Sequence, residues 1–124
     1  MGHWDHLGKD DSREGDQIFN GAIDNATGTA ALLALAKEFT LHSPKRSVLF
    51  IAVTAEEQGL LGSKYYGENP LYPLAQTVGA INMDALGSIG RVRDVVVIGH
   101  GFNQMQDYME TFAQQQNRVT IPDP

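Results

Sequence analysis

Apolar residues along the chain follow two spacings, which predict helices alternating with strands. A helix is predicted over Asn25–Phe39, with Asp24 or Asn25 capping its start. The apolar positions that face one side of it are Leu32, Leu35, Ala36 and Phe39. The continuous run Ser47–Val53, "SVLFIAV", is rich in β-branched residues and is typical of a strand buried on both faces.

The same two spacings of apolar residues continue to the end of the chain. The first twenty residues are instead polar and rich in glycine, and they are predicted to be loop. A short helix is predicted over Leu60–Tyr66, and a later helix from apolar residues at helical spacing. Those residues are Met105, Tyr108, Met109 and Phe112. The predicted further strands are Val78–Met83, Asp94–Gly99 and the "VTIP" stretch at Val119–Pro122. Alternation of this kind predicts an α/β fold with a mostly parallel sheet and helices on both faces.

Composition narrows the classes of function that the chain can have. Its 124 residues suit at most one domain, and 42% hydrophobic residues are ordinary for a globular protein. A net charge of −6 argues against nucleic-acid and anionic-membrane partners. The chain has no apolar run of about 18 residues and no signal-peptide pattern, so we predict no membrane partner. The sequence does not decide the cellular compartment. Because cysteine is absent, any metal must be held by His, Asp or Glu.

Carboxylates gather where predicted strands end. Glu56 and Glu57 follow Ser47–Val53, Asp84 follows Val78–Met83, and "HWDH" opens the chain at residues 3–6. Asp24 lies where a loop meets the first predicted helix. Ligands of open α/β sheets bind beyond the carboxyl ends of the strands, so these groups are expected to converge. Clustered carboxylates repel one another unless a divalent cation lies between them, and two ions bridged by one aspartate would suit a set this acidic.

Each of these residues also has an ordinary structural explanation. Asp24 could serve only as a helix cap, Asp84 as a turn residue, and the Glu56–Glu57 pair as a solvated loop. His3 stands next to the first methionine and could be disordered. His42 and His100 have no supporting context and are interpreted as surface or loop residues.

Four motifs in order resemble the co-catalytic di-zinc aminopeptidase family, the secreted bacterial aminopeptidases and their glutamate-carboxypeptidase-like relatives. They are "HWDHLG", "NGAIDNATGTAALLALA", "RSVLFIAVTAEEQGLLGSKYY" and "INMDALG". The resemblance covers Gly2 to Asp123, which is nearly the whole chain. It implies a three-layer α/β/α sandwich with a mostly parallel, mixed sheet, of which residues 1–124 would be a catalytic domain truncated at both ends.

The resemblance also implies a role for each matching residue. His3 and Asp84 resemble ligands of one zinc, Glu57 a ligand of the second, and Asp24 the bridging ligand, whose peptide bond to the next residue is typically cis. Glu56 resembles the general base, and Asp5 the carboxylate that orients His3. The implied reaction is hydrolysis of the amino-terminal peptide bond of a peptide substrate by a zinc-activated water. Relatives are commonly exported, so an extracytoplasmic or secreted location is implied.

The chain departs from the family pattern at its second zinc. The family supplies a further histidine from a Ser-Asp-His stretch, which would be expected after "NRVTIPDP", and neither His42 nor His100 fits that motif. We therefore expect two zinc ions in a complete site and one or none in this chain. Uncovered strand edges would favour a homo-oligomer. The alternatives left open are a non-catalytic interaction module and a related zinc carboxypeptidase or glutaminyl cyclase.

Overall fold

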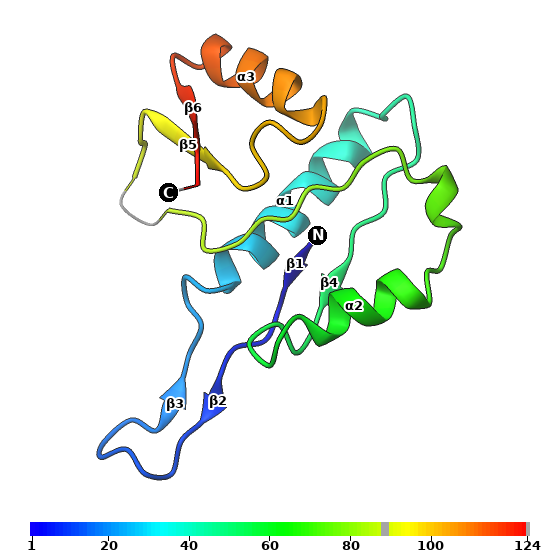
Figure 1. Ribbon diagram of the computed structural model, residues 1–124. Helices are drawn as coiled ribbons and strands as arrows, with labels where there is room; N and C mark the ends of the chain where they lie inside the picture. Colours follow the sequence, from blue (N-terminus) through cyan, green and yellow to red (C-terminus); the bar gives the residue numbers. More distant parts are fainter. Residues whose placement is uncertain (88–89, 124) are drawn as a thin grey trace. The chain divides into compact units, whose positions relative to one another are not determined.

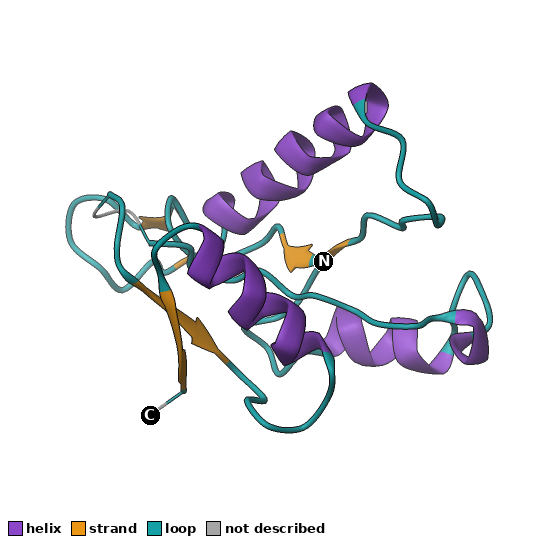
Figure 2. Cartoon of the chain, turned by 90° about the horizontal axis from the view of Figure 1, so that it is seen from above, coloured by secondary structure: helices purple, strands orange, loops and turns teal. Residues whose placement is uncertain are grey.

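The computed structural model describes residues 1–87 and 90–123, which form three α-helices and several short strands (Figures 1 and 2). The chain divides into two compact units, Met1–Gly87 and Ser88–Pro124. Each unit contains a parallel pair of strands together with helix, so the α/β class predicted from the sequence is confirmed. None of the helices within the described residues is long and apolar enough to cross a membrane.

Helix α1, Ala26–Leu41, is the longest element of the first unit and confirms the helix predicted from Asn25. Asn25 is the cap: its side-chain oxygen accepts a hydrogen bond from the backbone N–H of Gly28 at 2.9 Å. Leu32 is buried, and the helix contacts strand β1, which lies along it in Figure 1. Because Asn25 takes the capping role, the Asp24 carboxylate is left free for other partners.

Strand β1, Gly2–His3, pairs in parallel with β4, Ala52–Val53, so that His3 lies opposite Val53. Only the last two residues of the strand predicted over Ser47–Val53 are therefore regular. The prediction that the first twenty residues are loop is wrong, because they contain β1 and an antiparallel hairpin. The strands of the hairpin are β2, Gly8–Lys9, and β3, Ile18–Phe19. Backbone pairing with distant residues forms these elements, and a polar local pattern does not reveal it.

The predicted strand Val78–Met83 is wrong as a strand, although its end lies beside β1. The backbone N–H of Met83 donates to the carbonyl of Met1 at 2.9 Å, and the Met1 amino group donates to the carbonyl of Ile81. Gly2 bonds to Ile51 instead, on the opposite edge of β1. Val78 is 78% exposed, so the apolar run that predicted a buried strand has no cover among the described residues.

The remaining elements follow the sequence pattern closely. Helix α2, Leu61–Glu68, confirms the short helix, and a single 3₁₀ turn follows at Leu74–Gln76. In the second unit, β5, Asp94–Val97, pairs in parallel with β6, Val119–Pro122. Helix α3, Met105–Gln115, joins them and packs against β6.

The buried apolar core of the described residues is small. Its members are Leu32 and Val53 in the first unit and Ala113 in the second. Many large apolar side chains are exposed instead, including Leu33 at 69% and Ile98 at 80%. The most deeply buried side chains are polar, because His3 and Asn25 are each only 1% exposed. Burial in the first unit is thus concentrated where the predicted metal ligands lie.

Candidate metal centre

The centre is built around His3, which ends strand β1. Backbone hydrogen bonds fix the strand on both sides of this residue, because Gly2 donates to Ile51 and Trp4 donates to Val53, at 3.2 and 3.1 Å. The hydroxyl of Thr29, in α1, donates to the His3 carbonyl at 3.1 Å. The imidazole is therefore placed by β4 on one side and by α1 on the other, before any ligand is considered.

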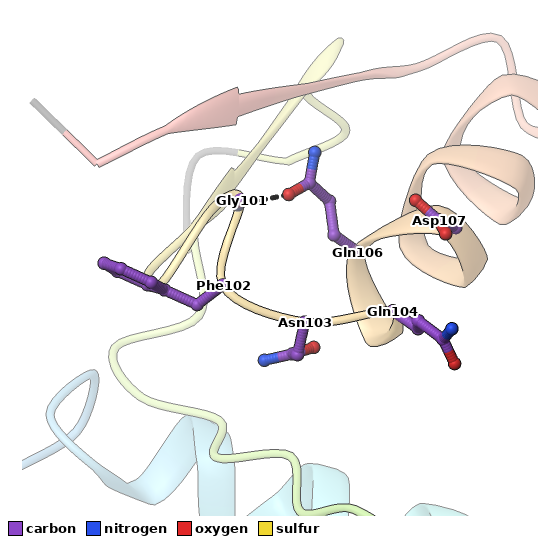
Figure 3. A pocket seen from close by; sticks show the side chains of 6 residues that line it. All are labelled: Gly101, Phe102, Asn103, Gln104, Gln106 and Asp107. Carbon is purple, nitrogen blue, oxygen red and sulfur yellow. Dashed lines mark hydrogen bonds between the residues drawn. The ribbon is translucent and has the colours of Figure 1, made fainter.

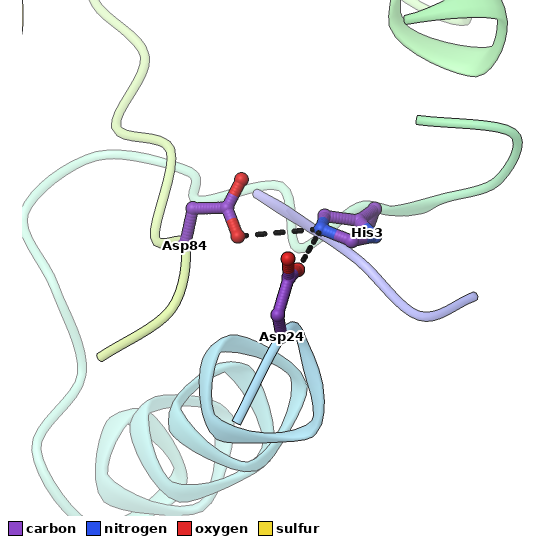
Figure 4. Close-up of side chains that lie close together, drawn as sticks. All are labelled: His3, Asp24 and Asp84. Carbon is purple, nitrogen blue, oxygen red and sulfur yellow. Dashed lines mark hydrogen bonds and ion pairs between the residues drawn. The ribbon is translucent and has the colours of Figure 1, made fainter. Parts of the chain in front are cut away.

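Two carboxylates meet the outward nitrogen of this imidazole. His3 Nε2 lies 3.0 Å from Asp24 Oδ1 and 3.2 Å from Asp84 Oδ1 (Figure 4). Asp24 immediately precedes the capping residue of α1, whereas Asp84 follows the segment that runs beside β1. We call His3, Asp24 and Asp84 the His3 group. Its ligand atoms all lie within 4.8 Å of one another, which is close enough to hold one metal ion.

Asn25 ties the segments that carry the two carboxylates together. Its amide nitrogen donates to the carbonyl of Met83 at 3.0 Å, while its oxygen caps α1 through Gly28. A side chain at Gly28 would clash with Met83 and with the Asn25 amide, so only glycine fits there. The Asp24–Asn25 peptide bond is cis, as the family resemblance implies. The start of α1 therefore sets the positions of Asp24 and of the residue before Asp84.

The other nitrogen of His3 faces Asp5. Nδ1 donates to the backbone carbonyl of Asp5 at 3.0 Å, and the Asp5 carboxylate lies 3.6 Å away. Burial alone would lower the pKa of His3, but the charge of Asp84 and the hydrogen bond to Asp5 raise that pKa above its ordinary value. Glu56 acts in the same direction. With its proton on Nδ1, a neutral His3 presents the lone pair of Nε2 to the two carboxylates of the His3 group.

The Asp5 carboxylate has a second partner. Its Oδ2 accepts a hydrogen bond from the backbone N–H of Ala55 at 2.8 Å. Ala55 has a φ of 55°, a left-handed conformation that non-glycine residues adopt rarely and mostly at turns or functional sites. The predicted orienting residue of His3 thus also fixes the loop that presents Glu56.

Glu56 and Glu57 are adjacent in sequence but meet different histidines. Glu56 Oε2 lies 4.0 Å from His3 Nε2, and Glu57 Oε1 lies 2.6 Å from His6 Nδ1. The loop folds back on itself, because the Glu56 carbonyl accepts from two successive N–H groups at its end, each at 2.8 Å. A cavity of about 240 Å³ opens beside His3 and Glu56, with Val53 among its apolar walls. Glu56 and Glu57 are neighbours in the sequence, but their carboxylates lie apart because the two side chains point toward different histidines.

The sequence interpretation assigned no role to His6. This residue, with Asp24 and Glu57, forms a second set of possible metal ligands within 4.8 Å of one another. We call these three residues the His6 group, and Asp24 belongs to both groups. The available signal was the second histidine of "HWDH", three residues beyond His3 at the end of a strand.

The chemistry of the centre fits a divalent cation. Within the part of the chain that the structure describes, most of the buried side-chain atoms without a hydrogen-bond partner lie here. They are Asp5 Oδ1, His6 Nδ1, Asp24 Oδ1 and Glu57 Oε1. Buried polar atoms are normally hydrogen-bonded, and a convergent set without partners is a place where a water or an ion binds. Imidazole nitrogens and carboxylate oxygens are suitable zinc ligands, and His3, Asp24 and Asp84 would hold one such ion.

The second unit contains a larger cavity of a different kind. It measures about 410 Å³ and is lined by residues of the loop before α3 and of its first turn (Figure 3). Gln106 reaches back across it and accepts a hydrogen bond from the backbone N–H of Gly101. Asp107 is the only ionisable residue in this lining. The cavity has no convergent set of reactive groups, so the metal centre is the candidate functional site.

Comparison with known proteins gives an independent result. Residues 1–124 match the family model described as Peptidase family M28. A probable zinc metalloprotease of Pyrenophora tritici-repentis is 40% identical over 68 residues, which are 55% of this chain and 14% of that protein. A probable zinc metalloprotease of Pyricularia oryzae is 37% identical over 68 residues, again 55% of this chain and 14% of the relative.

A vacuolar membrane protease of Verticillium alfalfae is 31% identical over 106 residues, which are 73% of this chain and 10% of that protein. The chain therefore spans 14% or less of the length of these three curated relatives. No solved structure matches it. The motifs quoted from the sequence and the family model point to the same family.

Proposed function

The chain belongs to peptidase family M28, and from this membership we propose that it carries the core of a zinc aminopeptidase site, which removes amino-terminal residues from peptides. The observation that supports this most is the convergence of Asp24 and Asp84 on the buried nitrogen of His3, at 3.0 and 3.2 Å. Glu56 lies next to the same nitrogen, at 4.0 Å. A ligand set and a free carboxylate side by side are what metal-assisted hydrolysis requires.

In this proposal the His3 group holds zinc, which when bound supplies an acidified water and a polarised substrate carbonyl. His3 binds through Nε2, because its Nδ1 proton is held by the Asp5 carbonyl at 3.0 Å. Asp5 acts as a positioning residue, since its carboxylate also bonds to Ala55 and so links His3 to the Glu56 loop.

Glu56 is proposed as the general base. Its Oε2 accepts a proton from the attacking water and returns that proton to the leaving amine, so that Glu56 ends each cycle as a carboxylate. Because Glu57 is directed toward His6, at 2.6 Å, it does not compete for that proton. A free substrate α-amine carries a positive charge, and the surrounding carboxylates would attract it. This attraction favours cleavage at the amino terminus of the substrate.

An assay with an aminoacyl-p-nitroanilide in the presence of zinc tests the proposal. We expect turnover to fall by about 10²- to 10⁴-fold in Glu56→Ala, with the zinc content unchanged. Glu68→Ala, at the exposed end of α2, is the matched control and should retain full turnover. Equal turnover of wild type and Glu56→Ala would contradict the role of Glu56. Equal cleavage of an amino-acetylated substrate would contradict the aminopeptidase specificity.

Self-association and location stay predictions. Exposed apolar side chains such as Leu33, Val78 and Ile98 support the expectation of a homo-oligomer, because monomers rarely expose large apolar patches. Light scattering at two protein concentrations tests it, and a monodisperse monomer at both would contradict it. The extracytoplasmic or secreted location implied by the resemblance is likewise proposed, and fractionation of the source cells tests it.

A further inference from the structure

We propose that Thr27, in the first turn of α1, is a positioning residue of the metal centre, and that its hydroxyl sets the separation of Asp24 and Asp84. This inference rests on the proposed function, because it concerns how the His3 group is held ready for its metal. The hydroxyl acts through the backbone beside each aspartate. Thr27 is a residue to which the family resemblance assigned no role.

The Thr27 hydroxyl makes two hydrogen bonds, one to each of the segments that carry the aspartates. It donates to the carbonyl of Ile23 at 2.7 Å and accepts from the backbone N–H of Leu86 at 2.9 Å. Ile23 immediately precedes Asp24, and Leu86 lies two residues beyond Asp84. A hydroxyl has one hydrogen to donate and two lone pairs, so both bonds form at the same time. One oxygen atom therefore joins the backbone beside the first carboxylate to the backbone beside the second.

Asp84 is held on both sides by side chains at the start of α1. Before it, the carbonyl of Met83 accepts from the Asn25 amide at 3.0 Å. After it, the N–H of Leu86 donates to Thr27 at 2.9 Å. A segment held at one end only keeps two soft dihedral angles in each of its residues, so its side chains are not fixed in direction. The two bonds together fix the segment that carries Asp84 at both ends.

The backbone between Asp84 and Leu86 depends on the second of these bonds. Ala85 has a φ of 43°, in the left-handed region that non-glycine residues rarely adopt. Such a conformation persists where the surrounding contacts hold it. Loss of the bond to Thr27 would let Ala85 relax toward a negative φ. The Asp84 carboxylate would then move from its place 3.2 Å from His3 Nε2.

Half of this arrangement has an ordinary explanation, and the chain offers a control for it. Threonine hydroxyls inside helices often bond to the carbonyl four residues earlier, and Thr111 in α3 does so with Asp107 at 2.8 Å. Among the hydrogen bonds of the described residues, the Thr111 hydroxyl has no second partner. Thr27 differs because Leu86 is 59 residues away in the sequence. Thr111→Val is therefore the matched control for Thr27→Val.

Co²⁺ titration of the metal-stripped full chain, followed by visible absorption, tests the proposal without an activity assay. The metal equivalent to follow is the one that His3→Gln removes. Thr27→Val keeps the branched shape without the hydroxyl and should weaken this equivalent by about 10- to 100-fold, the loss typical of residues that orient a ligand. The visible band should also shift, because Asp84 would no longer meet the ion in the same position. Thr27→Ser retains the hydroxyl, so it should bind Co²⁺ as wild type does, and so should Thr111→Val.

Hydrogen exchange of the Leu86 amide, measured by NMR on the metal-free chain, tests the bond itself. This amide should exchange faster in Thr27→Val than in wild type or Thr27→Ser, because its acceptor is lost. Equal exchange in wild type and Thr27→Val would show that the hydroxyl does not hold the turn, and the inference would be wrong.

The remaining outcomes separate this inference from the proposed function. If exchange rises in Thr27→Val while its Co²⁺ affinity and visible band equal those of Thr111→Val, the hydroxyl is only structural. The inference then fails while the proposed function stands. If wild type binds no metal that His3→Gln removes, the proposed function fails and the inference fails with it. Circular dichroism checks folding, and Thr27→Ala, which also lacks the hydroxyl, replaces Thr27→Val if the latter does not fold.

Discussion

The His3 group and the His6 group contain the same kinds of ligand but are held by the fold in different ways. His3 is 1% exposed and lies in a strand whose backbone is bonded to β4 and to α1. The His6 side chain is 21% exposed and lies beyond the end of that strand, against the hairpin residue Phe19. The first group is therefore part of the folded core, whereas the second lies at its margin.

The His3 group is therefore the preorganised part of the centre. Regular backbone hydrogen bonds and the buried Asn25 fix the His3 group whether or not a metal is bound. The His6 group brings together unpaired lone pairs, so it gains most from the ion itself. We expect the His3 group to bind its metal more tightly, and changes at the two groups to have separable effects.

The largest effect is expected from Gly28→Ala, which would break the support of the His3 group. The added methyl group would clash with Met83 and with the Asn25 amide, and would separate α1 from the segment before Asp84. Overpacking together with loss of the helix cap should lower the free energy of unfolding by about 2–4 kcal/mol. Urea unfolding of the metal-stripped chain measures it.

Gly67→Ala is the control for this substitution. Gly67 lies in α2, and a Cβ there would meet no atom within 4 Å. Alanine favours helix over glycine, so this variant should be more stable than wild type by about 0.5–1 kcal/mol. A loss of stability at both glycines, or at neither, would contradict the view that contacts around Asn25 organise the His3 group.

Asp84→Asn should separate the two groups by metal binding. Asp84 belongs to the His3 group alone, and replacing its charge with an amide removes a ligand without changing the side chain's size. We expect one metal equivalent to weaken by more than about 100-fold and the other to be retained. Isothermal titration with Zn²⁺ measures both. Asp94→Asn, on β5 in the second unit, is the control, and equal losses in the two variants would refute the assignment.

The parts of this centre that the sequence predicted depend on local pattern. Helix α1 follows from its apolar spacing, and Glu56 and Glu57 follow a strand whose last residues are regular. The structure brings Asp24, before α1, and Asp84, after the Val78–Met83 segment, to His3, as expected from the sequence. The catalytic and ligand roles of these residues stay predictions, because geometry alone does not test them.

The parts that the sequence did not predict depend on contacts between distant residues. Asn25 was interpreted as a possible cap, but its bond to Met83 joins positions 58 residues apart. The apolar residues of Val78–Met83 predict a strand, yet only the end of this segment finds a backbone partner, at Met1. His6 was overlooked because its meaning comes from Glu57, on a separate loop, and no local spacing shows that pairing.

The stability of the metal-free chain should depend on pH through His3, because the pKa of this residue is raised. A raised folded-state pKa stabilises the fold fully below the unfolded value of about 6.5, and this contribution is lost as pH rises through the folded value. With EDTA present, wild type should lose stability relative to His3→Gln as pH rises above the unfolded value of about 6.5. Saturating zinc should reverse the trend, since protons compete for Nε2. Identical pH profiles of the two proteins by urea unfolding would refute this.

The smallest effect is expected at the margin of the His6 group. Phe19→Leu removes the edge-on contact with the His6 ring and the stacking of Arg13 on Phe19, at 4.4 Å. The free energy of unfolding should fall by about 1 kcal/mol, and the weaker metal equivalent should lose about tenfold in affinity because His6 is less well oriented.

The tighter metal equivalent should not change in Phe19→Leu, because the Phe19 ring packs against His6, which does not belong to the His3 group. Phe102→Leu, at an 86% exposed position of the second unit, is the control and should leave both equivalents unchanged. Competition with a chromophoric chelator measures the two affinities separately. If Phe19→Leu weakened both equivalents equally, the two groups would respond as one unit. The distinction between a preorganised and a metal-dependent half of the centre would then be wrong.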